Sequence, residues 1–338
     1  MLRRVCLVVR TLHHRPVLLG LALAAFLLAT ISDRPALGAY PTKPIQLVVA
    51  FAPGGSSDQV SRLLADYVGR KWGKPVTVVN KPGGGGAVGN AAVAQAAPDG
   101  YTLANAQINT QAFIPAAQVK APYNWDSFTY ICRIGVTPSV LTVKGDSPYK
   151  TAKELIEAIK KNPDKFKSGV SGLTGTGAFG IGQLLSSAGV DPTKVDMVSF
   201  DGGSLVITNL AGGHVDFVAQ QLPEVLEMVK AGRLRALAQT NSERVKELPD
   251  VPTSKEAGFP AYDVMPAGGL VGPPNLPQEV VSKWEEVVTE ALKDKAFASA
   301  LERTGTIPAY QNSRQYRDWT EQQYKVARDL AEKLKIRK

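Results

Sequence analysis

The chain has 338 residues, 44% hydrophobic and 20% charged, with a net charge of +9. Its first 39 residues carry five Arg and one Asp, which leaves 34 basic and 29 acidic residues and a net charge of +5 for the remainder. That mild excess, without basic clusters interleaved with aromatic residues, argues against nucleic-acid binding and suits a small anionic ligand. The length allows a large core, which we predict to be divided between two lobes.

Residues 1–39 have the pattern of a cleaved secretory signal. Arginines between Arg3 and Arg15 precede the 15-residue apolar run Val17–Ile31, and small residues follow up to Ala39. The apolar run is shorter than a typical membrane span, so we predict secretion with cleavage near Ala39; a retained anchor helix is the alternative.

Cysteine and histidine are scarce after residue 39. Cys132 is the only cysteine there, so an internal disulfide is impossible, and its apolar surroundings favour a small core residue over a nucleophile. His214 is the only histidine there, so a His-rich metal site is excluded and a Ser-His-Asp triad would depend on this residue. We predict no metal and no cofactor.

The first part of the chain alternates apolar, β-branched runs with helical patterns. We expect strands and helices over Ile45–Phe51, Ser57–Trp72, Val76–Asn80, Gly89–Ala97 and Tyr101–Ala106, followed by a long loop. This alternation predicts a parallel sheet with helices on both faces. The strand expected over Val140–Lys144 leaves this first lobe.

The middle of the chain repeats the scheme. The expected helices and strands are Thr151–Asn162, Lys167–Ser171, Ala178–Ala188, Val195–Phe200, Leu205–Ala211, Val215–Gln220, Pro223–Ala231 and Leu234–Gln239. A turn-rich return, the apolar run Met265–Val271 and two helical segments, Pro277–Thr304 and Ser313–Lys335, complete the chain. We expect lobe 1 over 40–140 and 255–338, lobe 2 over 141–254, and hinge crossings near 138–145 and 238–270.

The loop Gly54-Gly55-Ser56-Ser57-Asp58 joins the first strand to the first helix. The first turn of a helix has unpaired N–H groups that favour an anion, glycines let a ligand approach the backbone, and serines add hydroxyl donors. This loop is therefore a candidate seat for a carboxylate or phosphate, and an ordinary capped turn is the alternative. Asp58 is an N-cap, a general base or a ligand for a substrate cation, and the N-cap is the commonest of these roles.

A counterpart loop, Ser171–Gly177, precedes a helix in the second lobe. Ligands of open α/β sheets lie beyond the carboxyl ends of the strands, so two facing lobes would bring two helix N-termini to one cleft. Gly84–Gly89 and Gly175–Gly180 both fit Gly-x-Gly-x-x-Gly, but neither has the acidic residue required about 20 positions later at a strand end. Nucleotide binding is therefore disfavoured.

Several segments together resemble one family. Phe51–Asp58 resembles the first ligand loop of Bug-type receptors, the extracytoplasmic solute-binding proteins of tripartite tricarboxylate transporters. Further matching segments follow in the same order: Val79–Gly85, Pro98–Leu103, Gly212–Asp216, Ala231–Ala238 and Leu248–Gly258. The resemblance covers essentially all of residues 40–338.

The resemblance implies a type II periplasmic binding protein of the α/β class. Two lobes, each with a mixed, mostly parallel sheet, would be joined by a hinge and close on a ligand in the cleft between them. A ligand carboxylate would be held by both loops, whose matching residues are Gly55, Ser56, Ser57 and Asp58 in the first and Gly175, Thr176 and Gly177 in the second. The extra Leu173 in the second loop allows a one-residue slip.

Phe179 stands where the family often has histidine, which removes a polar contact and suits a more apolar or aromatic carboxylate; a core position is the alternative. Gln107 and Gln220, at carboxyl ends of expected strands, are our predictions for reading the distal end of the ligand.

We predict a periplasmic receptor without catalytic activity. It would be a monomer that captures a small di-, tri- or aromatic carboxylate and delivers it to a membrane permease. The alternatives are a periplasmic hydrolase that uses Ser57 and His214, and a ligand sensor outside transport.

Overall fold

The computed structural model describes residues 40–200 and 202–333. From Lys43 onward these residues belong to one compact unit. In this part of the chain, no helix combines the length and the apolar character that a membrane span requires. The predicted secretory signal, its cleavage site and the alternative anchor helix lie outside the described residues.

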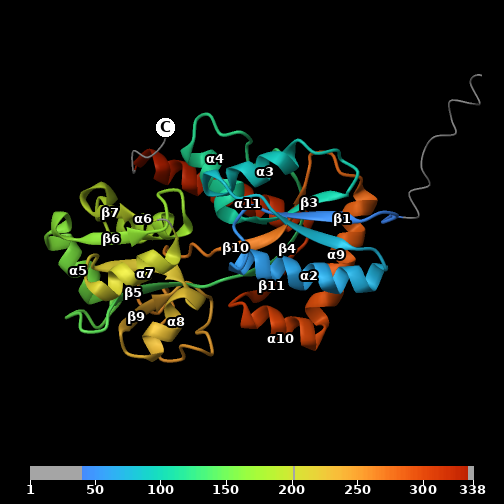
Figure 1. Ribbon diagram of the computed structural model, residues 1–338. Coiled ribbons are helices and arrows are strands. Elements are labelled where there is room, and N and C mark those ends of the chain that lie inside the picture. The colour runs from blue at the N-terminus through green and yellow to red at the C-terminus, as the bar shows by residue number, and fades with distance from the viewer. Residues whose placement is uncertain (1–39, 201, 334–338) are drawn as a thin grey trace, which may run out of the picture. The chain divides into compact units, whose positions relative to one another are not determined.

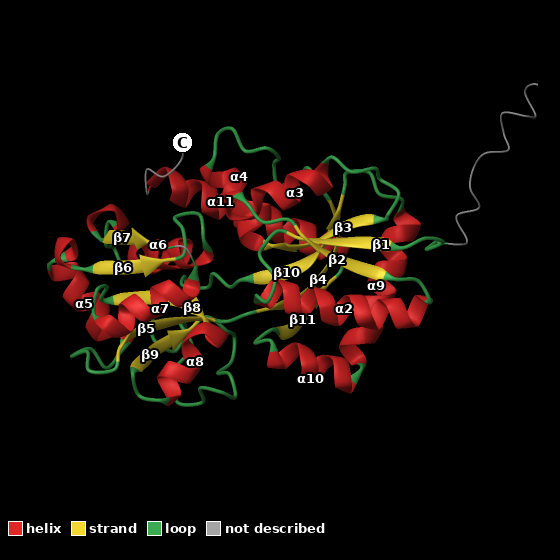
Figure 2. Cartoon of the chain, in the orientation of Figure 1, coloured by secondary structure: helices red, strands yellow, loops and turns green. Residues whose placement is uncertain are grey.

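Two β-sheets organise the unit (Figures 1 and 2). The six-stranded sheet has the order β11 (Ile307–Gln311), β4 (Thr129–Val136), β10 (Ala267–Gly272), β3 (Thr102–Gln107), β1 (Ile45–Val49) and β2 (Val76–Asn80). The five-stranded sheet has the order β7 (Asp196–Ser199), β6 (Lys167–Val170), β8 (Phe217–Gln221), β5 (Ser139–Lys144) and β9 (Leu234–Gln239).

Both sheets are mixed, and the α/β fold expected from the sequence is confirmed. β1 pairs in parallel with β2 and β3, and β6 does so with β7 and β8. The other five ladders are antiparallel, so the expected predominance of parallel pairing is wrong. The reason lies in the connections: the chain enters the second sheet directly from β4 into β5 and returns from β9 to β10, and β5 and β10 both pair antiparallel to their neighbours.

Helices cover both faces of each sheet (Figure 2). Those associated with the six-stranded sheet are α2 (Ser56–Trp72), α3 (Ala87–Ala94), α4 (Ile114–Ala117), α9 (Gln278–Lys293), α10 (Lys295–Arg303) and α11 (Ser313–Lys333). Those associated with the five-stranded sheet are α5 (Ala152–Lys161), α6 (Thr176–Ser187), α7 (Gly203–Gly212) and α8 (Leu222–Lys230). In the second sheet, α5 and α6 contribute to one apolar cluster, and α7 and α8 to another.

Four elements differ from the sequence expectation. The long loop expected after residue 106 contains the π-helical turn η3 (Asn109–Phe113), the short helix α4 and strand β4. Strand β11 also falls in a stretch where we expected none. β4 is hard to recognise because it is buried along most of its length and lacks an alternating pattern, and β11 is a short edge strand that contains Pro308.

Apolar packing also joins elements of the two halves. Phe179 of α6 lies with its ring centroid 4.4 Å from that of Phe113, and both side chains are about 1% exposed. The same cluster includes Ala327 and Leu330 of α11. Cys132 is fully buried in β4 and burial raises the pKa of its thiol, which confirms the interpretation as a small core residue.

Candidate ligand-binding cleft

The first predicted loop leads from β1 into α2 as expected. Gly55 is the N-cap with extended backbone, and α2 begins at Ser56, one residue earlier than predicted. Among the described residues, no side chain hydrogen-bonds the N-terminal N–H groups of α2 as an N-cap. These donors, together with the hydroxyl groups of Ser56 and Ser57, are therefore oriented for an acceptor at the helix N-terminus.

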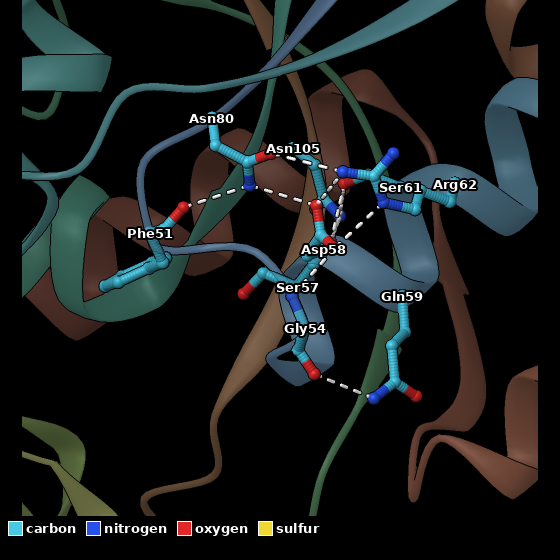
Figure 3. A network of polar contacts seen from close by, with 9 residues as sticks. All are labelled: Phe51, Gly54, Ser57, Asp58, Gln59, Ser61, Arg62, Asn80 and Asn105. Carbon is cyan, nitrogen blue, oxygen red and sulfur yellow. Dashed lines mark hydrogen bonds and ion pairs between the residues drawn. The ribbon is translucent and has the colours of Figure 1, made fainter.

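Asp58, for which the sequence left an N-cap, a general base and a ligand contact open, lines the cleft but directs its carboxylate into its own loop. It is the third residue of α2, and its carboxylate accepts hydrogen bonds from the Gly54 N–H at 2.9 Å and from Asn80 Nδ2 at 2.9 Å (Figure 3). Arg62 adds an ion pair at 2.9 Å. The Arg62 hydrogen bond is the largest cause that lowers the pKa of Asp58 to about 2, so the carboxylate is ionised and committed to the loop.

Two asparagines that sequence reasoning missed also hold the loop. Asn80 Nδ2 donates to the Phe51 carbonyl at 3.1 Å. Asn105, fully buried, donates to the Ser57 carbonyl at 3.2 Å and to Ser61 Oγ at 2.8 Å (Figure 3). Asn80 ends β2 and Asn105 lies inside β3, and each interrupts an apolar strand next to the loop. These polar interruptions are the sequence signals that could have identified the two residues.

A cleft of about 780 Å³ lies over this loop. Of the predicted site residues, seven line it: Gly55, Ser56, Ser57, Asp58, Gln107, Gly175 and Thr176. They come from β1–α2, the end of β3 and β6–α6, so the cleft has walls from both halves of the molecule. This size is typical of sites for small ligands.

The second predicted loop ends at Gly175, the N-cap of α6, and Thr176 is the first helical residue. A Cβ at Gly175 would lie 2.8 Å from the Ser171 carbonyl oxygen, so the tight loop requires glycine there. Gly177 does not line the cleft: a Cβ there would lie 2.7 Å from the Ala219 carbonyl oxygen, so this glycine lets α6 approach β8.

Two further predicted residues are also absent from the wall of the cleft. Phe179 packs in the core against Phe113, the alternative that the sequence left open, and it does not line the cleft. Gln220 is 4% exposed, and its Nε2 lies 3.5 Å from Ser171 Oγ. The neighbouring Gln221 lines the cleft instead, since successive strand residues point to opposite faces.

A third helix N-terminus opens on the cleft. Gly202 is the N-cap of α7, and Gly203 and Ser204 are its first two residues; all three line the wall, as does Glu224 of α8. The sequence indicated the helix start but gave no signal that it shared a cleft with the other two. Glu224 is solvent-exposed where it borders the cleft, but the protein packed around its carboxyl group desolvates it in part, and this desolvation raises its pKa to about 7.

The structure does not bring Ser57 and His214 together. His214 is exposed and follows the C-terminal end of α7, whereas the start of α7 lines the cleft. A helix of 10 residues is about 15 Å long, so His214 lies far from the cleft wall. Within the described residues, no group of three or more His, Cys, Asp or Glu side chains is arranged to hold a metal.

Two α/β halves that enclose a cleft lined by helix N-termini define the class of two-lobed periplasmic binding proteins. The family model described as the tripartite tricarboxylate transporter family receptor matches residues 60–336. The chain therefore belongs to this receptor family, TctC, and the resemblance to Bug-type receptors is confirmed.

Curated relatives match nearly the whole chain. A UPF0065 protein from the gbd 5′ region of Cupriavidus necator is 33% identical over 324 residues, 94% of this chain and 95% of the relative. The protein BugT of Bordetella pertussis is 29% identical over 302 residues, 88% of this chain and 92% of BugT.

Solved structures show the same fold. The periplasmic binding protein BugD is 29% identical with a TM-score of 0.73, covering 88% of this chain and 99% of BugD. MatC of Rhodopseudomonas palustris, with bound malate, is 26% identical with a TM-score of 0.73 (86% and 100% covered). Rpa4515 of R. palustris, with adipate, is 26% identical with a TM-score of 0.76 (88% and 98% covered).

Proposed function

We propose that this chain is a periplasmic receptor that captures a small carboxylate in the cleft and delivers it to a membrane permease. The N-termini of α2 and α6, at Gly55–Ser57 and Gly175–Thr176, would hold one ligand carboxylate between them. Closure of lobe 1 (40–140 and 255–338) on lobe 2 (141–254) would present the loaded monomer to the permease.

The observation that carries the proposal is the convergence of these two loops on one cleft. Each charge-assisted hydrogen bond from a helix N-terminus to a carboxylate contributes about 1.5–3 kcal/mol. Support for the ligand class comes from the family relatives with bound malate and adipate. Location in the periplasm follows from the family and from the predicted signal.

A thermal-shift screen with mono-, di- and tricarboxylates and aromatic acids tests the ligand class. A ligand present at about 100 times its Kd stabilises the folded state by about 2.7 kcal/mol and raises the melting temperature by several degrees. Calorimetric titration with recovery of unchanged carboxylate would distinguish the receptor from the hydrolase alternative. Turnover that disappears in His214→Ala would contradict the receptor.

Bulky variants test the position of the carboxylate. Gly55→Trp is well suited, because a Cβ at Gly55 meets nothing within 4 Å and its backbone is extended, whereas Gly175 has no room for a side chain. We expect Gly55→Trp and Thr176→Trp to abolish the thermal shift and to keep the wild-type circular dichroism. Val119→Trp, at a position 63% exposed and away from the cleft, is the matched control and should bind normally.

A further inference from the structure

The carboxylate of Glu224 lies against the N-terminus of α7 inside the cleft. A Cβ at Gly203 would overlap the Glu224 carboxyl group, so the acid occupies the space directly over the first residue of this helix. The Gln221 N–H also hydrogen-bonds the carboxylate. Since Gln221 is the N-cap of α8 and Glu224 its third residue, this contact has the form of a capping box.

Among the described residues, no cationic side chain forms an ion pair with Glu224. The cleft wall holds two other ionisable side chains among the described residues: Asp58, which is paired with Arg62, and Arg303, whose Nη1 donates to Ser299 Oγ at 3.2 Å. No described ion pair involves Glu224.

The elements packed against α8 do not supply a cation either. α7 and β8 contain no Asp, Glu, His, Lys or Arg among their described residues. Arg235 of β9 donates to backbone carbonyls of residues 145, 147 and 149, and Lys144 of β5 pairs with Asp146. Glu302, beside Arg303, pairs with Lys246, and Asp201 lies outside the described residues.

We propose that Glu224 is a specificity-determining residue, whose carboxylate competes with a ligand carboxylate for the N-terminus of α7, so that a second ligand anion binds there together with a proton. This inference rests on the proposed function, in which α2 and α6 hold the first carboxylate. It concerns the distal carboxylate of the ligand. At the start of α7 this carboxylate would lie beside that of Glu224, and the two negative charges would repel each other.

The sign of the pH dependence follows from the charges. Partial desolvation by the surrounding protein already raises the pKa of Glu224 to about 7, although the residue is exposed to the cleft. An anion beside it raises the pKa further, so binding takes up a proton. The affinity for a dianion then falls as the pH rises above about 7, whereas ligand carboxyl groups of ordinary pKa, about 4, stay ionised throughout. A monoanion, held by α2 and α6 alone, should show little dependence on pH.

Adipate and hexanoate are matched probes, because they have the same chain length and differ in one carboxylate; malate is the short dianion. Calorimetry at about pH 6.5 and about pH 8.5 would measure their Kd values for wild type and Glu224→Gln. Glutamine at the third helical position keeps the capping box, so the fold is preserved. Glu227→Gln on the same helix, away from the cleft and with its side chain 85% exposed, is the control.

We expect the wild-type Kd for adipate or malate to rise about tenfold between the two pH values, and Glu224→Gln to remove most of that rise. The hexanoate Kd and the Glu227→Gln variant should change less than about twofold. Equal pH profiles for wild type and Glu224→Gln, or weaker dicarboxylate binding by Glu224→Gln at about pH 8.5, would overturn the inference while leaving the receptor intact. Absence of any carboxylate binding by wild type across the earlier screen would instead contradict the proposed function.

Discussion

Asp58 of α2 and Glu224 of α8 occupy the same place in two helices that border one cleft, yet their charge environments are opposite. Each is the third helical residue and accepts a hydrogen bond from a backbone N–H at or before the N-cap. Asp58 has Arg62 one turn later, and its pKa is lowered to about 2. Glu224 has the apolar Met228 one turn later, and desolvation raises its pKa to about 7.

The comparison teaches that a helix-start carboxylate can serve either as a structural element or as a chemically responsive group, depending on its partners. The Asp58 carboxylate is tied back into its own loop, which leaves the α2 donors available. The Glu224 carboxylate instead lies over the start of a different helix, α7, where it meets the contents of the cleft.

The largest effect should come from breaking the support of the α2 loop. Asn105→Ala removes the donors to the Ser57 carbonyl and Ser61 Oγ in a fully buried site, so we expect a loss of about 2–3 kcal/mol in the free energy of unfolding. Urea denaturation measures this loss. Asn124→Ala, at an exposed turn, is the control and should cost less than about 0.5 kcal/mol. Equal midpoints for the two variants would show that the Asn105 contacts do not support the loop.

A smaller effect should come from Asp58→Asn, and it should depend on pH. Because the folded pKa of about 2 lies below the ordinary value of 3.8, the ionised carboxylate stabilises the protein above about pH 4, and this contribution is lost as pH falls toward 2. Allowing for solvent screening at the half-exposed Arg62, we expect a cost of about 1–2 kcal/mol at neutral pH. Urea midpoints of the variant and wild type should converge near pH 2; a constant difference down to that pH would contradict the assignment.

The smallest effect, with the opposite sign, is expected for Glu224→Gln. A folded pKa of about 7, above the ordinary 4.5, means that the ionised form is disfavoured in the folded state, so wild-type stability falls as pH rises through this range. Because cleft water screens the carboxylate, we expect the variant to be more stable by only about 1 kcal/mol at about pH 8 and equal to wild type near pH 4. Urea midpoints at the two pH values decide this, with Glu227→Gln as the reference. A destabilised Glu224→Gln at about pH 8 would show that the ionised acid stabilises the start of α7.

Much of the fold follows from local patterns along the chain. The run from Ile45 to Phe51, stopped by a Pro-Gly-Gly turn and followed by Ser-Ser-Asp, predicts a strand, a turn and a helix start, and the structure has all three. The loop Ser171–Gly177 is predicted in the same way, although α6 begins at Thr176, two residues earlier than expected. These elements can be recognised in the sequence because hydrophobic periodicity and turn-forming residues act over only a few positions.

The sequence by itself therefore determined the two βα loops, the order of most elements and the family. Only the tertiary structure decided that Phe179 packs in the core, that Gln221 lines the cleft while Gln220 does not, and that Glu224 shares a wall with Gly203 and Arg303. The physical reason is distance along the chain: which face of a strand or helix meets which partner depends on how separate segments pack. The same reason explains Asp58, whose role as a tied-back carboxylate depends on Asn80, 22 residues later, as well as on its helical neighbour Arg62.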